Sequence, residues 1–241
     1  MKIGILETGL LNEKLQDQYE PYPVMFATLL DRAEKDLSYQ SYSVIRGEMP
    51  DSVKDCDGWL ITGSRHAVYE NLPWMLDLQD FIRGIDAARV PLVGICFGHQ
   101  IVAQALGGEV VESDKGWGIG VQSYQIDVVQ PWMPRAAKEV RIYAFHQDQV
   151  VRLPPQAQVY LSSAFCPYAG LSYGDSIITM QAHPEFEEEY EVTLLELYGG
   201  NIVPEAEAEA ALDWMRSTGQ KADTQMLAEW IAEFFQRSGQ T

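Results

Sequence analysis

The segment from Pro91 to Leu106 constrains the fold of this chain more than any other stretch. Residues 92–95 form a short apolar run that predicts a buried strand, and residues 101–106 predict a helix that ends at two glycines. Cys96 lies between them, with one glycine two residues before it and another two residues after it. Such a tight turn from strand to helix needs glycine around its central residue and pushes that side chain into the open. The pattern predicts a nucleophile elbow centred on Cys96.

Two interpretations of Cys96 follow from its surroundings. A free cysteine is most often a small buried hydrophobe. A cysteine at a helix N-terminus, however, meets the helix dipole and free N–H groups, which favour the thiolate. Gly94 and Gly98 favour the second interpretation, because a cysteine that only packs in a core does not need glycine on both sides.

The order of the other elements predicts an α/β fold. A strand at residues 2–6, a helix that begins at Tyr22 and a strand at residues 39–45 form a β-α-β unit, which is typical of a parallel sheet. Later strand-like runs predict an antiparallel or mixed extension of that sheet, at residues 121–129, 140–145, 157–164 and 168–173. We therefore expect a mostly parallel central sheet that is flanked by helices and carries an antiparallel extension.

The last part of the chain is predicted to be helical. Residues 187–197 form one helix, and two later runs form two more, the last of them with an apolar stripe. We find no internal repeat and no low-complexity linker. We expect one domain over residues 1–241, with a core at about residues 2–198 and a helical C-terminal extension at about residues 199–241.

The composition argues against several partners and sites. The chain has 17 Lys and Arg residues against 35 Asp and Glu residues, a net charge of −18, whereas nucleic acids and anionic membranes need a basic surface. Its three cysteines, Cys56, Cys96 and Cys166, have no CxxC spacing, which argues against a disulfide framework or a zinc site. The N-terminus is not typical of a signal peptide, and no apolar run has membrane-spanning length. We expect a cytoplasmic protein.

His183 is the strongest candidate for a partner of Cys96. An apolar strand at residues 176–181 delivers it to the carboxyl edge of the sheet. A lone histidine is more often structural than catalytic, but Glu185 follows two residues later, beyond Pro184, so both side chains can point into one crevice. Glu185 can then hold the imidazole in one tautomer. Cys96, His183 and Glu185 together predict a nucleophilic triad.

Two further segments are candidate walls of a site. Thr62-Gly63-Ser64 follows a short apolar run, although these residues alone fit an ordinary connection better. His66 and Tyr69, which come next, fit an exposed loop better than a pocket. The second candidate is a polar loop at residues 146–150, between two predicted strands. The glycine-rich turn at residues 115–120 matches neither a phosphate loop nor a dinucleotide site.

With these features identified, the sequence resembles the class I (triad) glutamine amidotransferases. The resemblance is carried by residues 94–100, residues 181–186 and the turn at residues 62–64, and it extends over most of the chain. Through residues 146–150 the chain is most similar to stand-alone proteins related to the amidotransferase domain of GMP synthase. The resemblance implies a flavodoxin-like fold.

The resemblance also implies a role for each site residue. Cys96 would attack the side-chain amide of glutamine, His183 would transfer the proton, and Glu185 would orient the imidazole. The residues implied to stabilise the oxyanion through backbone N–H groups are Gly63 and Phe97. The residues implied to bind the substrate are Gln100, Phe145, His146 and Gln147. The reaction needs no metal or organic cofactor, and a synthetase on a separate chain would accept the ammonia.

The turn at residues 62–65 departs from the family, because it reads Thr-Gly-Ser-Arg where Gly-Gly-Pro or Gly-Pro-Gly is usual. Three functions therefore stay open. The first is hydrolysis of glutamine, and the second is hydrolysis of γ-glutamyl compounds by the same triad. The third is a non-catalytic binding or regulatory role on the same fold, against which the intact triad argues.

Overall fold

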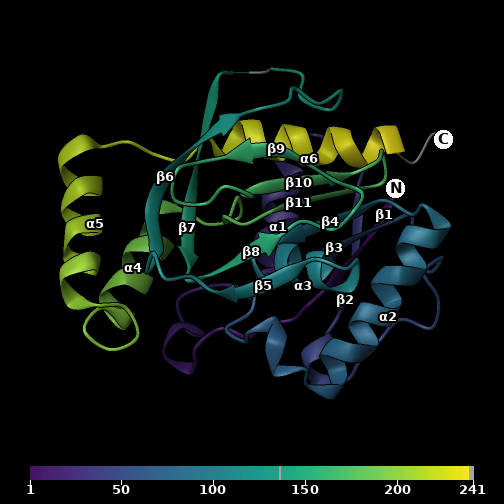
Figure 1. The fold of residues 1–241 in the computed structure, drawn as a ribbon, viewed down its shortest axis with the longest axis horizontal. Coiled ribbons are helices and arrows are strands. Elements are labelled where there is room, and N and C mark those ends of the chain that lie inside the picture. The colour runs from purple at the N-terminus through teal and green to yellow at the C-terminus, as the bar shows by residue number, and fades with distance from the viewer. Residues whose placement is uncertain (136, 239–241) are drawn as a thin grey trace.

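A computed structural model describes residues 1–135 and 137–238 (Figure 1). Its strands are β1 (Lys2–Leu6), β2 (Ser38–Tyr42), β3 (Gly58–Ile61), β4 (Leu92–Ile95), β5 (Glu109–Glu112), β6 (Gly118–Ile126), β7 (Glu139–His146), β8 (Asp148–Arg152), β9 (Ala157–Ser162), β10 (Gly170–Tyr173) and β11 (Ile177–Met180). Nine of them form the central sheet, in the order β2-β1-β3-β4-β11-β10-β9-β6-β7, and β5 pairs with β8 in a smaller sheet.

The half of the sheet that ends in β11 is parallel. β2, β1, β3, β4 and β11 pair in parallel. β3, β4 and β11 are buried along their whole length, as expected where helices cover both faces of a parallel sheet. The carboxyl ends of these strands lie at one edge, so the turns after β3, β4 and β11 meet there. The parallel sheet predicted from the sequence is confirmed.

The other half is the predicted antiparallel extension, which runs through β11, β10, β9, β6 and β7. Two local predictions were wrong. The run at residues 39–45 leaves the sheet after Tyr42, because Val44 turns into the core on a short 3-10 helix. The predicted loop at residues 146–150 contains most of β8, whose backbone is paired with β5. A polar segment can form a strand when a partner strand lies beside it.

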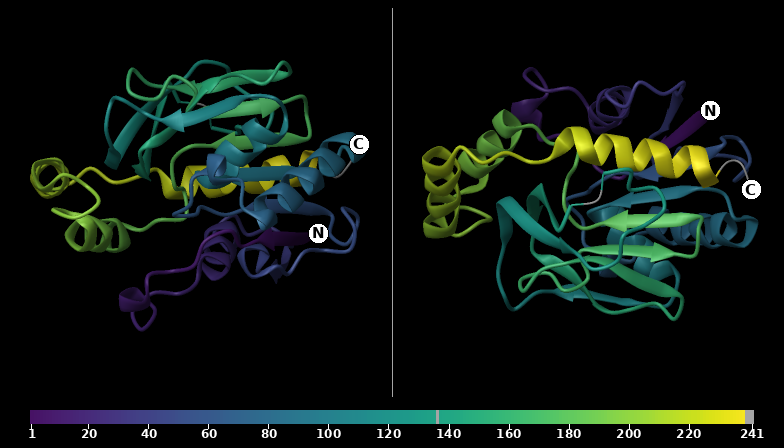
Figure 2. Two further views of the ribbon diagram at one scale, coloured as in Figure 1. Left: turned by 60° about the horizontal axis from the view of Figure 1, so that its bottom comes forward. Right: turned by 90° about the horizontal axis from the view of Figure 1, so that it is seen from above.

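Helices cover both faces of the sheet (Figure 2). They are α1 (Tyr22–Asp31), α2 (Pro73–Ala88), α3 (Phe97–Ala105), α4 (Glu188–Tyr198), α5 (Glu205–Thr218) and α6 (Thr224–Ser238). α2 and α3 pack on one face around Trp59 and Leu92. α1 and α6 pack on the other face around Ile5 and Val93. α4 and α5 lie at one end of the molecule and enclose a third apolar cluster with β6 and β7.

The C-terminal helices are part of the packed structure. The apolar stripe predicted for the last helix is confirmed, since Trp230, Phe234 and Phe235 of α6 are almost fully buried. The Trp132 ring contacts those of Trp230 and Phe234 at centroid distances of 6.2 and 6.1 Å. Such burial stabilises a fold by about 1.5–3 kcal/mol for each large apolar side chain.

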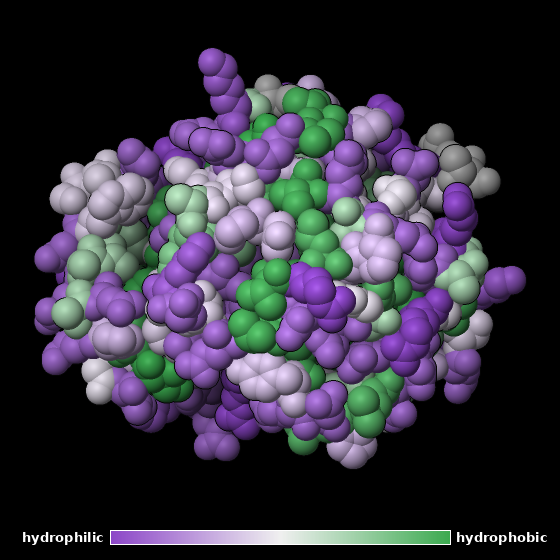
Figure 3. Space-filling model, in the orientation of Figure 1, coloured by the Kyte–Doolittle hydropathy of each residue, from purple (hydrophilic) through white to green (hydrophobic). Residues whose placement is uncertain are grey.

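The outer surface is mainly hydrophilic on the face shown in Figure 3, with smaller apolar areas between the polar side chains. No described helix is both long enough and apolar enough to cross a membrane.

Candidate active site

Cys96 occupies the tight turn between β4 and α3. Its backbone has φ +53° and ψ −103°, a conformation that a residue with a side chain rarely adopts. A Cβ on Gly94 would lie 2.7 Å from the Gly98 carbonyl oxygen, and a Cβ on Gly98 would lie 2.5 Å from the Ile61 carbonyl oxygen. Both glycines are therefore sterically required, and the predicted elbow geometry is present.

His183 and Glu185 follow β11 and reach the same place. The His183 N–H donates to the Tyr143 carbonyl oxygen at 2.7 Å, which fixes the backbone beside β7. The ring Nδ1–H donates to Glu185 Oε1 at 2.8 Å. The imidazole also stacks on the Phe186 ring, with centroids 4.0 Å apart and an interplanar angle of 8°. The ring is therefore held on its face and at Nδ1, and Nε2 remains for another partner.

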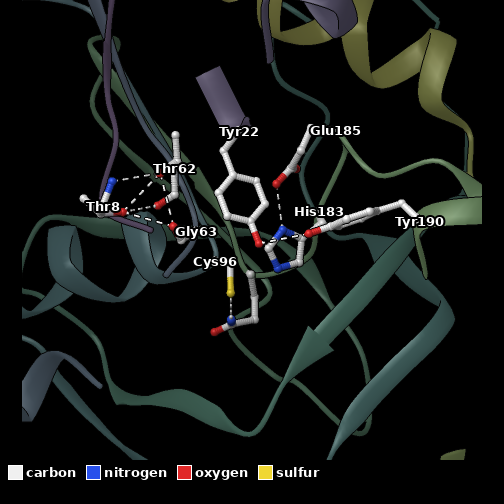
Figure 4. A network of polar contacts seen from close by, with 9 residues as sticks. Thr8, Tyr22, Thr62, Gly63, Cys96, His183, Glu185 and Tyr190 are labelled. Carbon is white, nitrogen blue, oxygen red and sulfur yellow. Dashed lines mark hydrogen bonds and ion pairs between the residues drawn. The ribbon is translucent and has the colours of Figure 1, made fainter. Parts of the chain in front are cut away.

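The three side chains of the predicted triad lie together in a nearly closed site (Figure 4). Cys96, His183 and Glu185 are 5–6% exposed. Burial by itself would lower the pKa of His183, but the Glu185 carboxylate and the Cys96 sulfur raise that pKa well above its usual value. An imidazolium is thus favoured next to the sulfur. The Gln181 side-chain amide approaches the same sulfur at 3.8 Å.

The turn after β3 lies against this pair. A Cβ on Gly63 would be 2.9 Å from His183 Cε1 and 3.7 Å from Cys96 Cβ, so only a glycine fits. The Gly63 carbonyl accepts hydrogen bonds from the Thr8 hydroxyl at 3.2 Å and the Thr62 hydroxyl at 3.1 Å. These bonds fix the orientation of the turn. Among the described residues, no hydrogen bond occupies the N–H groups of Gly63 and Phe97.

Two of the predicted substrate-binding residues, Gln100 and His146, lie on the side of Cys96 that Gln181 borders. The Gln100 amide donates to Gln181 Oε1 at 3.2 Å and to the Asp148 carbonyl at 3.0 Å. His146 Nδ1–H donates to the same carbonyl at 3.2 Å. Burial lowers the pKa of His146 to about 4, so this ring is neutral at physiological pH.

The other two predicted substrate-binding side chains point elsewhere. Phe145 packs against Trp117 and Tyr198, with centroids 5.4 and 5.7 Å away. The Gln147 amide donates to Glu112 at 2.9 Å. For these two residues, only the backbone can serve the predicted role.

Sequence reasoning missed several residues around the triad. Thr8, Gln181, Tyr22 and Tyr190 all lie close to it, and Figure 4 shows the Tyr22 and Tyr190 hydroxyl groups beside the His183 imidazole. The sequence marks Tyr22 only as a helix start, and no spacing links it to Cys96. Gln181 is part of a matched motif, but the sequence predicts no role of its own for it.

His66 lies in the predicted loop, whereas Tyr69 lies on a short 3-10 helix, Val68–Glu70, that follows it. His66 Nδ1 contacts Glu70 at 3.0 Å, and Tyr69 is 44% exposed. The Tyr69 hydroxyl nevertheless donates to Asp148 Oδ1 at 3.2 Å. Among the described residues, no cluster of three or more His, Cys, Asp or Glu side chains could hold a metal ion.

The family follows from a direct comparison with known proteins. The model of the family described as "Glutamine amidotransferase class-I" matches residues 32–196. The chain therefore belongs to the class I glutamine amidotransferase family, and the resemblance found in the sequence is confirmed.

Individual relatives carry different names. Gamma-glutamyl peptidase 4 of Arabidopsis thaliana is 31% identical over 202 residues, which cover 79% of this chain and 79% of the peptidase. A glutamine-hydrolyzing GMP synthase subunit of Sulfolobus acidocaldarius is 30% identical over 156 residues, or 63% of this chain and 80% of its own length. A solved glutamine amidotransferase structure from Methylobacillus flagellatus covers 98% of this chain and 93% of its own, with a TM-score of 0.73 and 23% identity. The expected flavodoxin-like amidotransferase fold is confirmed.

Proposed function

We propose that this protein hydrolyses γ-glutamyl amide bonds through a thioester on Cys96, with glutamine as the simplest substrate. The observation that carries the proposal is the buried contact set in which Glu185 holds His183 at 2.8 Å and the Cys96 side chain lies beside the same imidazole (Figure 4). A cysteine on an elbow, a histidine base and a carboxylate that orients it are the requirements of nucleophilic acyl transfer.

The first half of the reaction transfers the glutamyl group to sulfur. His183 takes the proton from Cys96, and the thiolate attacks the γ-carbonyl carbon of the substrate. The oxyanion is stabilised by the N–H groups of Gly63 and Phe97, which are free to donate among the described residues. The C–N bond then breaks, and His183 donates its proton to the leaving nitrogen.

The second half releases glutamate. His183, now neutral, takes a proton from a water molecule, and the resulting hydroxide attacks the thioester carbon. The C–S bond breaks and the thiolate–imidazolium pair is restored. The glutamyl end of the substrate contacts Gln100 and His146, together with the backbone at Phe145 and Gln147. No other co-reactant is required.

A second candidate substrate is a γ-glutamyl peptide, from which an amine with an attached chain leaves in place of ammonia. Relatives named γ-glutamyl peptidases favour it. The same triad serves both substrates, because the bond that breaks is the same. For glutamine, a synthetase on a separate chain would accept the ammonia, as the names of the GMP synthase relatives suggest.

We also propose that the chain forms a single domain and is located in the cytoplasm.

The experiment is a comparison of Cys96→Ala with Cys166→Ala. Cys166 is also buried, but burial raises its thiol pKa to about 12, so it is a matched cysteine without nucleophilic character. We expect Cys96→Ala to lose at least roughly a thousandfold in kcat/KM on glutamine or a γ-glutamyl peptide, and Cys166→Ala to keep its activity. If the wild type and Cys96→Ala were equally inactive on both substrates, the proposed hydrolysis would be contradicted. The non-catalytic binding or regulatory role would then remain.

A further inference from the structure

Tyr22 and Tyr190 form a paired wall beside the triad. Their hydroxyl oxygens are 3.2 Å apart. Tyr22 stacks on Phe186 with centroids 6.5 Å apart, and Tyr190 meets the same ring edge-on at 4.7 Å. Phe186 in turn stacks on His183 at 4.0 Å. We call Tyr22, Phe186 and Tyr190 the tyrosine wall.

The hydroxyl of Tyr22 faces the reaction centre. Figure 4 shows it directed toward the His183 imidazole, and Glu185 and Cys96 contribute to the raised pKa of this phenol. Tyr22 as a whole residue is partly exposed, but its hydroxyl lies in a buried environment. A leaving group that extends from His183 along the tyrosine wall would meet this hydroxyl.

The hydrogen bonding of the two tyrosines leaves one hydroxyl proton available for a ligand. Among the described residues, the two hydroxyl groups hydrogen-bond only to each other. Burial raises the pKa of both phenols, so both stay protonated at physiological pH. When Tyr190 donates to Tyr22, the Tyr22 proton is free for an acceptor such as a carbonyl oxygen.

The position of the wall identifies which part of the substrate it meets. The glutamyl end is assigned to Gln100 and His146, which converge on the Asp148 carbonyl at the Gln181 side of Cys96. The leaving nitrogen must instead lie at His183, because it takes the His183 proton. The tyrosine wall packs on His183 through Phe186, and so it belongs to the leaving-group side.

We propose that Tyr22, held by Tyr190, is a specificity-determining residue that donates a hydrogen bond to the carbonyl of an amino acid or peptide leaving group. The inference rests on the proposed thioester function and narrows its substrate to γ-glutamyl peptides. Ammonia from glutamine has no carbonyl and gains nothing from this bond. A site with a fixed polar group discriminates against a substrate that lacks the matching partner.

The test compares γ-glutamylalanylglycine with glutamine, using the full chain and its Tyr22→Phe variant. Phenylalanine keeps the ring on Phe186 and removes only the hydroxyl. We expect kcat/KM for the peptide to fall on the order of tenfold more than kcat/KM for glutamine, mainly through KM, since one hydrogen bond to the bound ligand is lost. Tyr190→Phe should shift the same ratio in the same direction by a smaller factor.

Tyr19→Phe is the matched control. Tyr19 also packs edge-on against Tyr190, with centroids 4.9 Å apart, but its hydroxyl bonds to Thr193 at 2.7 Å. Its substrate ratio should equal that of the wild type. A Tyr22→Phe variant that loses the two activities equally, or neither, overturns the inference. So does a wild type that cleaves glutamine but no γ-glutamyl peptide, which leaves the thioester function intact. A wild type inactive on both overturns the function as well.

Discussion

The site has two walls that are built in different ways. The elbow wall, made of Gly63, Gly94, Cys96 and Gly98, is shaped by backbone, and added Cβ atoms at its glycines would come within 2.5–2.9 Å of their neighbours. The tyrosine wall is shaped by side chains from α1, α4 and the segment between β11 and α4. A wall made by backbone cannot change without moving the sheet edge, whereas a hydroxyl can be removed from the other wall without moving its ring. The elbow wall is thus suited to reaction steps that are the same for every substrate. The tyrosine wall is suited to discrimination between substrates.

The largest effect should come from Gly98→Ala in the elbow wall. The new methyl group would meet the Ile61 carbonyl oxygen at 2.5 Å, so the elbow must shift. We expect kcat/KM to fall by roughly a thousandfold, and the free energy of unfolding to fall by about 1–3 kcal/mol from overpacking. Activity assays and urea denaturation measure the two effects.

Gly84→Ala is the control for that substitution. Gly84 lies within α2, where an added Cβ meets only a Val53 side-chain carbon, at 3.3 Å, and no backbone. The Gly84→Ala variant should keep full activity. If Gly98→Ala retained more than a tenth of the wild-type activity, the elbow wall would not be the rigid element described above.

Glu185→Gln should have the next largest effect, because it weakens the hydrogen bond that orients His183. The His183 imidazole lies between the elbow wall and the tyrosine wall. The carboxylate accepts from His183 Nδ1–H and raises the pKa of that imidazole. We expect kcat/KM to fall by roughly a hundredfold, as the tautomer and the imidazolium both lose support.

The pH profile of Glu185→Gln gives a second readout. In the wild type, His183 should keep its proton as the pH rises past the ordinary histidine value. Because the leaving nitrogen takes that proton, kcat/KM should fall only at higher pH. Without the carboxylate the imidazole gives up its proton earlier, and this fall should move to lower pH. An unchanged profile would contradict the assigned cause of the His183 pKa.

Glu191→Gln should have the smallest effect on activity and a measurable effect on stability. Glu191 follows Tyr190 in α4 and is fully buried, and its Oε1 accepts from the Gly120 N–H at 2.8 Å. Burial raises the pKa of this carboxyl to about 8. As the pH rises toward 8, the unfolded chain therefore binds fewer protons than the folded one, and wild-type stability falls through that window.

Glutamine carries no such proton, and its amide oxygen can accept the same Gly120 bond. The variant should therefore be more stable than the wild type by about 1–3 kcal/mol at pH 8, with a much smaller difference at pH 5. Denaturation at the two pH values measures this difference. Equal stability changes at both values would mean that the carboxyl does not retain its proton in the fold.

Much of the fold and part of the site were accessible from the sequence. The parallel strands, the elbow and the His183–Glu185 pair each depend on residues within a few positions of one another, such as glycines around a turn or two side chains across Pro184. Local structure of this kind can be predicted directly from sequence patterns. The wrong assignments, at residues 39–45 and 146–150, fell where pairing or burial by distant segments decided the backbone.

The sequence by itself therefore determined the α/β class, the elbow turn at Cys96 and the His183–Glu185 pair, because steric and chemical requirements of neighbouring residues fix them. Only the tertiary structure decided which residues surround that centre. Tyr22 and Tyr190 are 168 positions apart, and Thr8 lies 55 positions from the Gly63 carbonyl that it holds. Such contacts arise from the packing of helices and strands against one sheet, a property of the whole chain that no local pattern encodes.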